Sequence, residues 1–265
     1  GKDTKVYASV TGSSAFSQCE HIRKVSLCYT ENTSAISMIF PDGYKNIREI
    51  ELYRGSTTVG QRTELVDYFG CAGLSALEKI TIPAGVKTIG NYAFSGCTSL
   101  KQITLPSPIE YISYGAFRDC KNLQRINLPS RIDTIGNNAF ENTGLEAVVL
   151  PKSMKLIGNR AFAGCGKLKS VTLPDVLDYN GGKLFYNDTL LATITIPAGF
   201  PLSKGTFYGC KGLQSIVNEA TVPQSNGRSN ANGLILNGEQ YSPNQSLEMI
   251  LLPFQQLPSD KSFYM

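Results

Sequence analysis

A repeat of about 23 residues runs from Leu77 to Gly212 and decides what this chain can fold into. Six consecutive units follow the form LxxIxLPxxIxxIGxxAFxxC, and their lengths are 23, 23, 22, 23, 23 and 22 residues. A single unit of this kind cannot enclose a core, so neighbouring units must stack and bury their apolar side chains against one another. The repeat therefore predicts a solenoid.

Each unit begins with a short predicted strand. A leucine opens the unit, an Ile or Val stands three residues on, and a further Ile or Leu follows two residues later. This two-residue step is typical of a strand whose apolar side chains face inward. A proline comes next and has no N–H to donate, so the strand should end there. These prolines are Pro83, Pro106, Pro129, Pro151, Pro174 and Pro197.

A phenylalanine recurs once per unit, after a second apolar pair on the return side of the coil. We expect these rings to lie in the core, where burying one contributes roughly 1.5–3 kcal/mol. Each coil should therefore depend on the next one for the burial of its ring. The residues are Phe94, Phe117, Phe140, Phe162, Phe185 and Phe207.

Glycines follow the second apolar pair in three units, at Gly90, Gly136 and Gly158. Glycine at a repeated turn position suggests a backbone with positive φ, and Ser113 holds this position in the second unit either with an ordinary φ or with strain. The fifth unit has Asn180 where Ile is expected, and two glycines follow it. We expect a kink or loosened packing there.

The chain divides into three regions. Residues 1–46 are an N-terminal cap with a partial repeat, residues 47–218 are the solenoid, and residues 219–265 are a C-terminal loop and hairpin cap. In the last region, the apolar segments 233–236 and 247–252 flank a polar stretch, which predicts a β-hairpin. Such a hairpin would cover the open end of the stack, as a terminal unit must.

The LxxIxLPxxIxxIGxxAFxxCxx pattern resembles the BspA-like leucine-rich repeats. The resemblance implies a leucine-rich-repeat solenoid, a right-handed coil stack with a parallel β-sheet of short strands, an irregular N-terminal cap and a C-terminal β-hairpin. Members of that family are typically exported proteins of host-associated bacteria, so the resemblance also implies a cell-surface or periplasmic location. It implies binding or adhesion and brings no catalytic residues. A membrane tether would be a lipid anchor outside this chain.

The cysteines point to structure and not to chemistry. Five of the seven stand three residues before a unit's first apolar residue, and we place Asn142 and Asp188 at the same position in other units. A position that accepts Cys, Asn or Asp predicts a small side chain at a turn, hydrogen-bonded to the backbone. The odd count and the parallel side chains expected for Cys97 and Cys120 argue against disulfides. We therefore expect free, inert thiols.

Motifs for catalysis, cofactors and metals are missing from the sequence. There is no CxxC, nucleophile elbow, phosphate-binding loop or EF-hand, and His21 is the single histidine. We expect no catalytic, cofactor or metal site. The net charge of +4 is too small to indicate nucleic acid, and no apolar stretch is long enough for a transmembrane helix. A basic cluster favours a solvated face and comprises Lys152, Lys155, Arg160, Lys167 and Lys169.

The outward strand positions form the candidate partner-binding face. They are mostly polar, and Thr is also the ordinary choice for an exposed strand, so a merely solvated sheet remains an alternative. The functional interpretation is a flat platform for an extended protein partner, with a basic end at Lys79, Lys101 and Arg125. The candidate residues are Lys79, Thr81, Lys101, Gln102, Thr104, Arg125, Asn127, Ser170 and Thr172.

A glycan is the alternative ligand. Sugar-binding platforms usually present aromatic rings, and the outward strand positions have none. The aromatic side chains that could serve a glycan lie on other parts of the coils, at Tyr92, Tyr111, Tyr114, Tyr186 and Tyr208.

Overall fold

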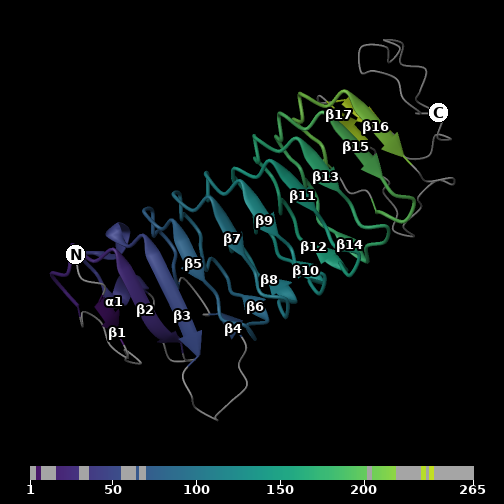
Figure 1. Cartoon of the computed structure of the whole chain (residues 1–265). Helices are drawn as coiled ribbons and strands as arrows, with labels where there is room; N and C mark the ends of the chain where they lie inside the picture. The colour runs from purple at the N-terminus through teal and green to yellow at the C-terminus, as the bar shows by residue number, and fades with distance from the viewer. Residues whose placement is uncertain are drawn as a thin grey trace.

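The computed structural model describes residues 4–6, 16–29, 36–54, 64–65, 70–201, 205–218, 234–236 and 239–241. These residues form one elongated, gently curved stack of coils (Figure 1). The solenoid predicted from the repeat is therefore confirmed.

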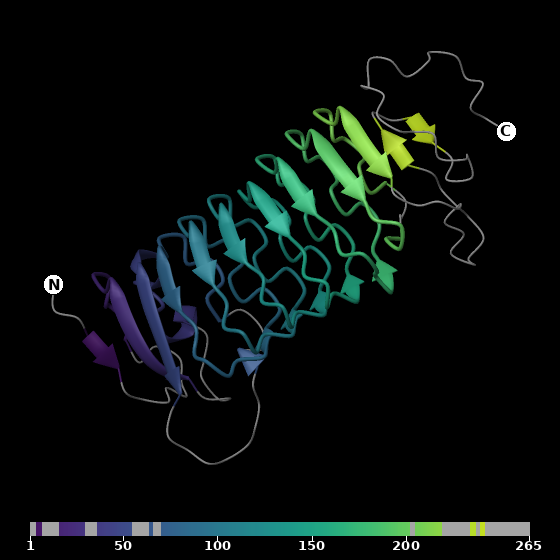
Figure 2. The ribbon, with the colours of Figure 1, turned by 45° about the vertical axis from the view of Figure 1, so that its right-hand side comes forward.

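One face of the stack carries a row of parallel strands, which we call the front row (Figure 2). Equivalent residues of successive units pair directly, as Ile103 does with Ile126 and Val148 with Val171. The pairing also continues before the aligned repeats, where Ile50 lies opposite Ile80. The strands of this row are β1 (Thr4–Val6), β2 (Lys24–Tyr29), β3 (Glu49–Arg54), β5 (Lys79–Thr81), β7 (Gln102–Thr104), β9 (Arg125–Asn127), β11 (Ala147–Val149), β13 (Ser170–Thr172), β15 (Thr193–Ile196) and β16 (Ser215–Asn218).

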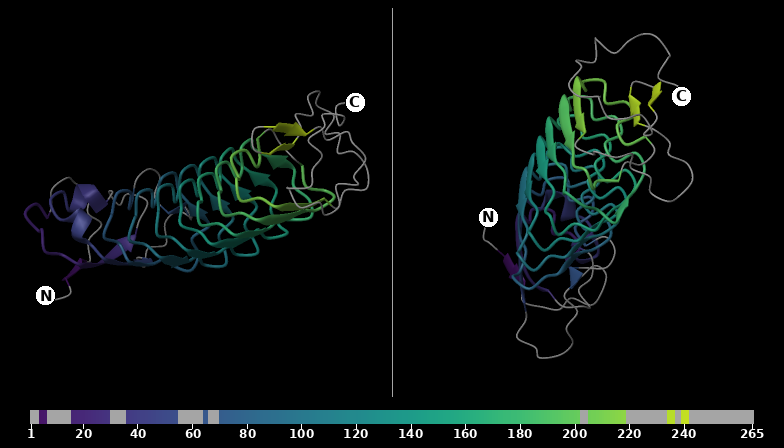
Figure 3. Two further views of the ribbon diagram at one scale, coloured as in Figure 1. Left: turned by 90° about the horizontal axis from the view of Figure 1, so that it is seen from above. Right: turned by 90° about the vertical axis from the view of Figure 1, so that its right-hand side faces the viewer.

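The return side of the coils forms a second parallel sheet, the back row, and the two rows enclose the core (Figure 3). In the fifth unit Asn180 pairs with Ile157, so the ladder continues through the position where Ile is replaced. The strands are β4 (Glu64–Leu65), β6 (Thr88–Ile89), β8 (Tyr111–Ile112), β10 (Thr134–Ile135), β12 (Leu156–Ile157) and β14 (Tyr179–Asn180).

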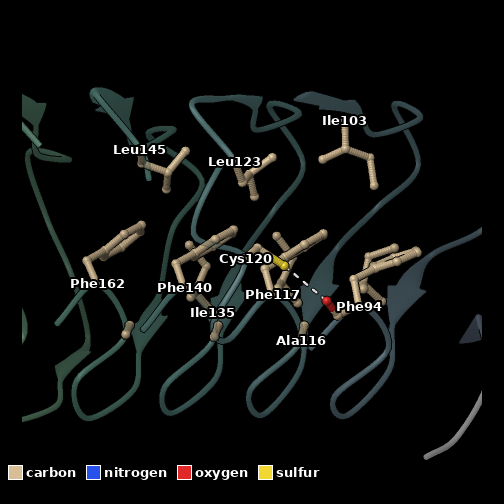
Figure 4. Packing of buried hydrophobic residues seen from close by; sticks show 14 of the residues in the cluster. Phe94, Ile103, Ala116, Phe117, Cys120, Leu123, Ile135, Phe140, Leu145 and Phe162 are labelled. Carbon is tan, nitrogen blue, oxygen red and sulfur yellow. Dashed lines mark hydrogen bonds between the residues drawn. The ribbon is translucent and has the colours of Figure 1, made fainter. Parts of the chain in front are cut away.

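The phenylalanine rings stack along the centre of the molecule, and all six are fully buried (Figure 4). Successive centroids from Phe94 to Phe162 lie 5.3, 5.3 and 5.2 Å apart. The step then widens to 5.9 Å between Phe162 and Phe185 and to 5.8 Å between Phe185 and Phe207. The fifth unit thus keeps its backbone ladder, while its ring packs at a greater distance.

The glycine prediction was wrong in its physical reason. Gly90, Gly136 and Gly158 do not have positive φ, and neither does Ser113. At Gly136 an added Cβ would lie 2.8 Å from the backbone of Ser113 in the preceding coil. A Cβ at Gly158 would meet the backbone nitrogen of Asn137. At Gly136 and Gly158 glycine is favoured because successive coils approach each other closely there.

Both chain regions outside the aligned repeats contain some described structure. Near the N-terminus a short helix α1 (Ile36–Ile39) and a 3-10 turn η1 (Tyr44–Asn46) precede β3. At the other end, β17 (Leu234–Leu236) pairs antiparallel with β18 (Glu239–Tyr241). A hairpin is therefore present, but its second strand is not the expected segment 247–252, which lies outside the described residues.

Candidate binding surface

The outward strand residues lie where the alternation predicts. Eight of the nine candidate residues are on front-row strands, and all eight are exposed. Their inward neighbours Ile80 and Ile103 are buried. Lys101 is also exposed, but it precedes β7 and so lies at the edge of the face, in the position that Glu78 holds one unit earlier. The front row thus presents two adjacent columns of side chains to solvent.

Two apolar side chains interrupt the polar columns at β11. Ala147 and Val149 are both exposed, and 67% of Val149 is accessible. The face is therefore polar on both sides of these two exposed aliphatic side chains.

The basic end of the face differs from the expectation. The Lys79 ammonium lies 3.1 Å from the Glu49 carboxylate, which also pairs with Lys24 at 3.5 Å. The hydrogen bond from Lys79 is the main cause that lowers the pKa of Glu49. Glu49 is on β3, outside the aligned units, so the repeat gave no sign of this pair. Lys79 thus shares the single negative charge of Glu49 with Lys24, whereas Lys101 and Arg125 form no ion pair with a described side chain.

Two lysines of the basic cluster pair with acids of neighbouring coils. Lys152 lies 3.2 Å from Asp175, and Lys155 lies 3.4 Å from Asp133. These pairs are exposed and contribute little net attraction each. The arrangement supports the solvated-face interpretation for this cluster.

Glu141 is a buried acid that the sequence analysis did not single out. Its carboxylate binds the Arg118 guanidinium at 3.1 Å and the Arg160 guanidinium at 2.8 Å, and it accepts a hydrogen bond from Asn138 Nδ2 at 2.9 Å. Arg160 also lies over the ring of Tyr186, 5.2 Å from its centroid. Position 141 varies between units, so no recurring pattern could have indicated this role.

A shallow hollow of about 400 Å³ opens where the third unit is one residue short. Cys120 is three residues from the next leucine, whereas only Gly144 separates Thr143 from Leu145. The hollow is open to solvent and carries charges of both signs, and Asp119 Oδ1 accepts a hydrogen bond from Asn142. It lacks the enclosed, convergent groups of an active site. Its lining residues are Asp119, Lys121, Asn142, Thr143, Gly144, Gly164, Gly166 and Lys167.

The six cysteine side chains in the described part of the chain are free thiols. Four of them donate hydrogen bonds to the backbone. Cys97 donates to the carbonyl of Cys71 at 3.1 Å, and Cys120 donates to the carbonyl of Phe94 at 3.0 Å. Cys165 and Cys210 make equivalent bonds at 3.2 and 2.9 Å. Burial raises the pKa of Cys120 to about 12 and removes it from nucleophilic chemistry.

The cysteine position of the third unit was assigned wrongly. Thr143 occupies it, because its N–H binds the carbonyl of Phe140 as the N–H of Cys120 binds that of Phe117. The buried Thr143 hydroxyl lies 3.1 Å from the sulfur of Cys165. Asn142 is exposed and has a φ of 58°. The missing residue lies after the cysteine position, which an alignment on the leucines could not show.

Among the described residues, no three His, Cys, Asp or Glu side chains gather as a metal site would require. None of the helices in the same residues is long and apolar enough to cross a bilayer.

Comparison with known proteins identifies the repeat. The family of BspA type leucine rich repeat regions matches residues 68–145 and 133–232, with six copies. The chain belongs to this family. The resemblance seen in the sequence is thereby confirmed. No curated protein matches the BspA-type chain.

Several solved structures are similar to this BspA-type chain. A leucine-rich repeat protein from Bacteroides ovatus is 23% identical, with a TM-score of 0.47, and the match covers 76% of this chain and 60% of that protein. The T. pallidum leucine rich repeat protein is 24% identical, with a TM-score of 0.43 and 71% coverage of both chains. Pneumococcal vaccine antigen PcpA is 19% identical, with a TM-score of 0.37, and 81% of this chain and 69% of PcpA are covered.

Proposed function

We propose that this BspA-type chain is an exported, non-catalytic binding protein whose front row holds an extended segment of a protein partner. The observation that supports this most is the exposed double column on β5 to β15, which repeats with every coil. Parallel strands lie ~4.8 Å apart, so a segment crossing them would meet a new pair of side chains at each coil. The shallow hollow and the inert buried thiols support a role without catalysis.

The charges of the front row favour a partner segment with acidic residues. Lys101 and Arg125 come from consecutive coils, are exposed and are not neutralised by described acids. Complementary charge at such a rim raises the association rate and selects the partner more than it adds affinity. The aliphatic side chain of Val149, two strands from β7, gives the segment an apolar contact.

Charge reversal tests this surface. A partner is first captured from host extracellular proteins by the full chain, and its affinity is then measured for K101E/R125E. We expect at least a tenfold loss, mostly in the association rate and smaller at high salt. The matched control is K45E/K211E, which reverses two exposed lysines outside the front row. Equal affinity of K101E/R125E and the control would contradict the proposal.

A glycan ligand is the second candidate, favoured by tyrosines outside the front row. Tyr111, Tyr114 and Tyr208 are 42%, 37% and 41% exposed, and an aromatic ring is a suitable stacking surface for a sugar. A glycan array with the native chain and with Y111A/Y114A tests it. Hits that disappear in the double variant would support glycan binding, and an array without hits would remove it.

Export to the bacterial surface is the location that the family resemblance implies. Protease treatment of intact cells that carry the full-length gene tests it. We expect the protein to be digested without lysis, and protection until lysis would contradict a surface location.

A further inference from the structure

In four coils, a thiol at the cysteine position donates a hydrogen bond to a backbone carbonyl of the preceding coil. The thiols of Cys120, Cys165 and Cys210 donate to the carbonyls of Phe94, Phe140 and Phe185, each in the preceding coil. In the fifth unit this position is Asp188, whose side chain is completely buried. An ionised aspartate has no proton to donate, so it could not make the bond that these thiols make.

Asp188 also changes the hydrogen bonding of the turn at Cys165, in the preceding coil. Its Oδ1 accepts the N–H of Cys165 at 2.7 Å. In other units, this N–H binds the carbonyl of the phenylalanine three residues earlier, as Cys120 binds Phe117 at 3.2 Å and Cys210 binds Phe207 at 3.1 Å. The carbonyl of Phe162 is therefore left without its usual donor, and it is the carbonyl to which position 188 should donate.

The second oxygen of Asp188 is the remaining acceptor. Oδ2 is buried and has no hydrogen-bond partner among the described residues. Two acceptors, Oδ2 and the Phe162 carbonyl, thus belong to one buried position. A single proton between them would satisfy both, whereas a bare carboxylate would leave both unsatisfied.

Among the described residues, no positively charged side chain lies against Asp188. The titratable groups that face it are the thiols of Cys165 and Cys210, one from each neighbouring coil. The lysines on the same two turns, Lys167 and Lys211, are exposed. A buried carboxylate without a cation is costly, and such a group is neutralised instead.

We propose that Asp188 is a neutral carboxylic acid in the folded protein and that its hydroxyl donates to the Phe162 carbonyl in place of the cysteine thiol. The fifth coil is then a proton-dependent element of the solenoid. Burial acts in the same direction. It raises the pKa of Asp188 well above its ordinary range, and it outweighs the backbone hydrogen bonds at Cys165 and Gly164, which act to lower the pKa.

The proposal fixes the sign of a pH dependence. In the unfolded chain Asp188 loses its proton near pH 4, and in the folded chain it keeps the proton up to a much higher pH. The unfolded state is therefore favoured as the pH rises between these two values. The stabilisation is fully present below about pH 4 and is lost as the pH rises toward the native pKa.

The experiment compares urea unfolding of the full native chain with D188N between pH 4 and pH 7. Asparagine offers a donor and an acceptor at every pH. We expect the unfolding equilibrium constant of the native chain to rise about tenfold per pH unit relative to D188N. The exposed Asp178 of the same coil gives the matched control, D178N, whose ratio to the native chain should stay nearly constant. A constant or falling ratio for D188N would overturn the proposal.

A second measurement uses only the native protein, so it does not depend on whether D188N folds. Carbon-13 NMR of aspartate side chains in the native protein should show one carboxyl that remains in the protonated position at pH 7. If all aspartate carboxyls have moved to the ionised position by pH 7, Asp188 is charged and the proposal is overturned.

Discussion

The rings of Phe117 and Phe140 lie almost parallel, with 5.3 Å between their centroids and 3° between their planes. Each ring thus forms part of the wall against which its neighbour is buried. The stability of one coil is therefore shared with the coils on both sides.

Truncating a central ring should destabilise the whole stack. F140A should reduce the free energy of unfolding by about 3–5 kcal/mol, since it leaves a cavity between two rings. F140L fills most of that space and should cost distinctly less. Urea unfolding followed by circular dichroism measures both, and equal losses for the two variants would contradict the stacked arrangement.

The close approach of coils at Gly158 gives a second prediction. G158A places a Cβ against the backbone of Asn137, which cannot rotate away, so we expect a loss of about 1–3 kcal/mol. The matched control is G166A, where an added Cβ would lie 3.9 Å from Thr189 Oγ1, an ordinary contact. Thermal unfolding compares the two, and the prediction is wrong if G166A is the more damaging change.

The buried thiols should be unreactive in the folded state. Burial raises the pKa of Cys71, Cys120 and Cys210 to about 12, so at pH 8 almost no thiolate is present at these positions. Alkylation at pH 8 followed by peptide mass spectrometry should label them only after denaturation. The half-buried Cys19 serves as the internal comparison and should be modified first. Rapid labelling of Cys120 in the folded protein would contradict the prediction.

The ion pair of Glu49 should make a contribution to folding stability that is lost at acidic pH. Folding lowers the pKa of Glu49, so the stabilisation is present above the ordinary glutamate pKa and is lost as the pH falls through the native value. K79M removes the hydrogen bond that is the main cause of the lowered pKa, so the pKa of Glu49 should rise. NMR titration of the Glu49 carboxyl would show this rise. K101M changes a lysine without this contact and should leave the titration unaltered.

Sequence periodicity was sufficient for the coils and their interior. The phenylalanine stack and the backbone-bonded thiols follow from residue types at fixed spacing, and the structure confirms both. Spacing could not distinguish the two reasons for a recurring glycine in the repeat. Positive φ and close approach require the same residue, and the φ angles together with the distance from Gly158 to Asn137 decide between them.

The candidate face was less predictable because its charges come from outside the aligned units. Glu49 forms an ion pair with Lys79 from 30 residues away, in a strand that lies outside the six aligned units. The one-residue deletion in the third unit similarly hid Thr143 until hydrogen bonds fixed its position. The outward columns themselves were predicted correctly as exposed, but their partner is a proposal.

The wider ring step after Phe162 coincides with β14, the last back-row strand in the described part of the chain. Mechanical load along the long axis should therefore concentrate just after this strand. In a molecule pulled from both ends, the rod should fracture first between its fifth and sixth turns, and the turns before the break should hold.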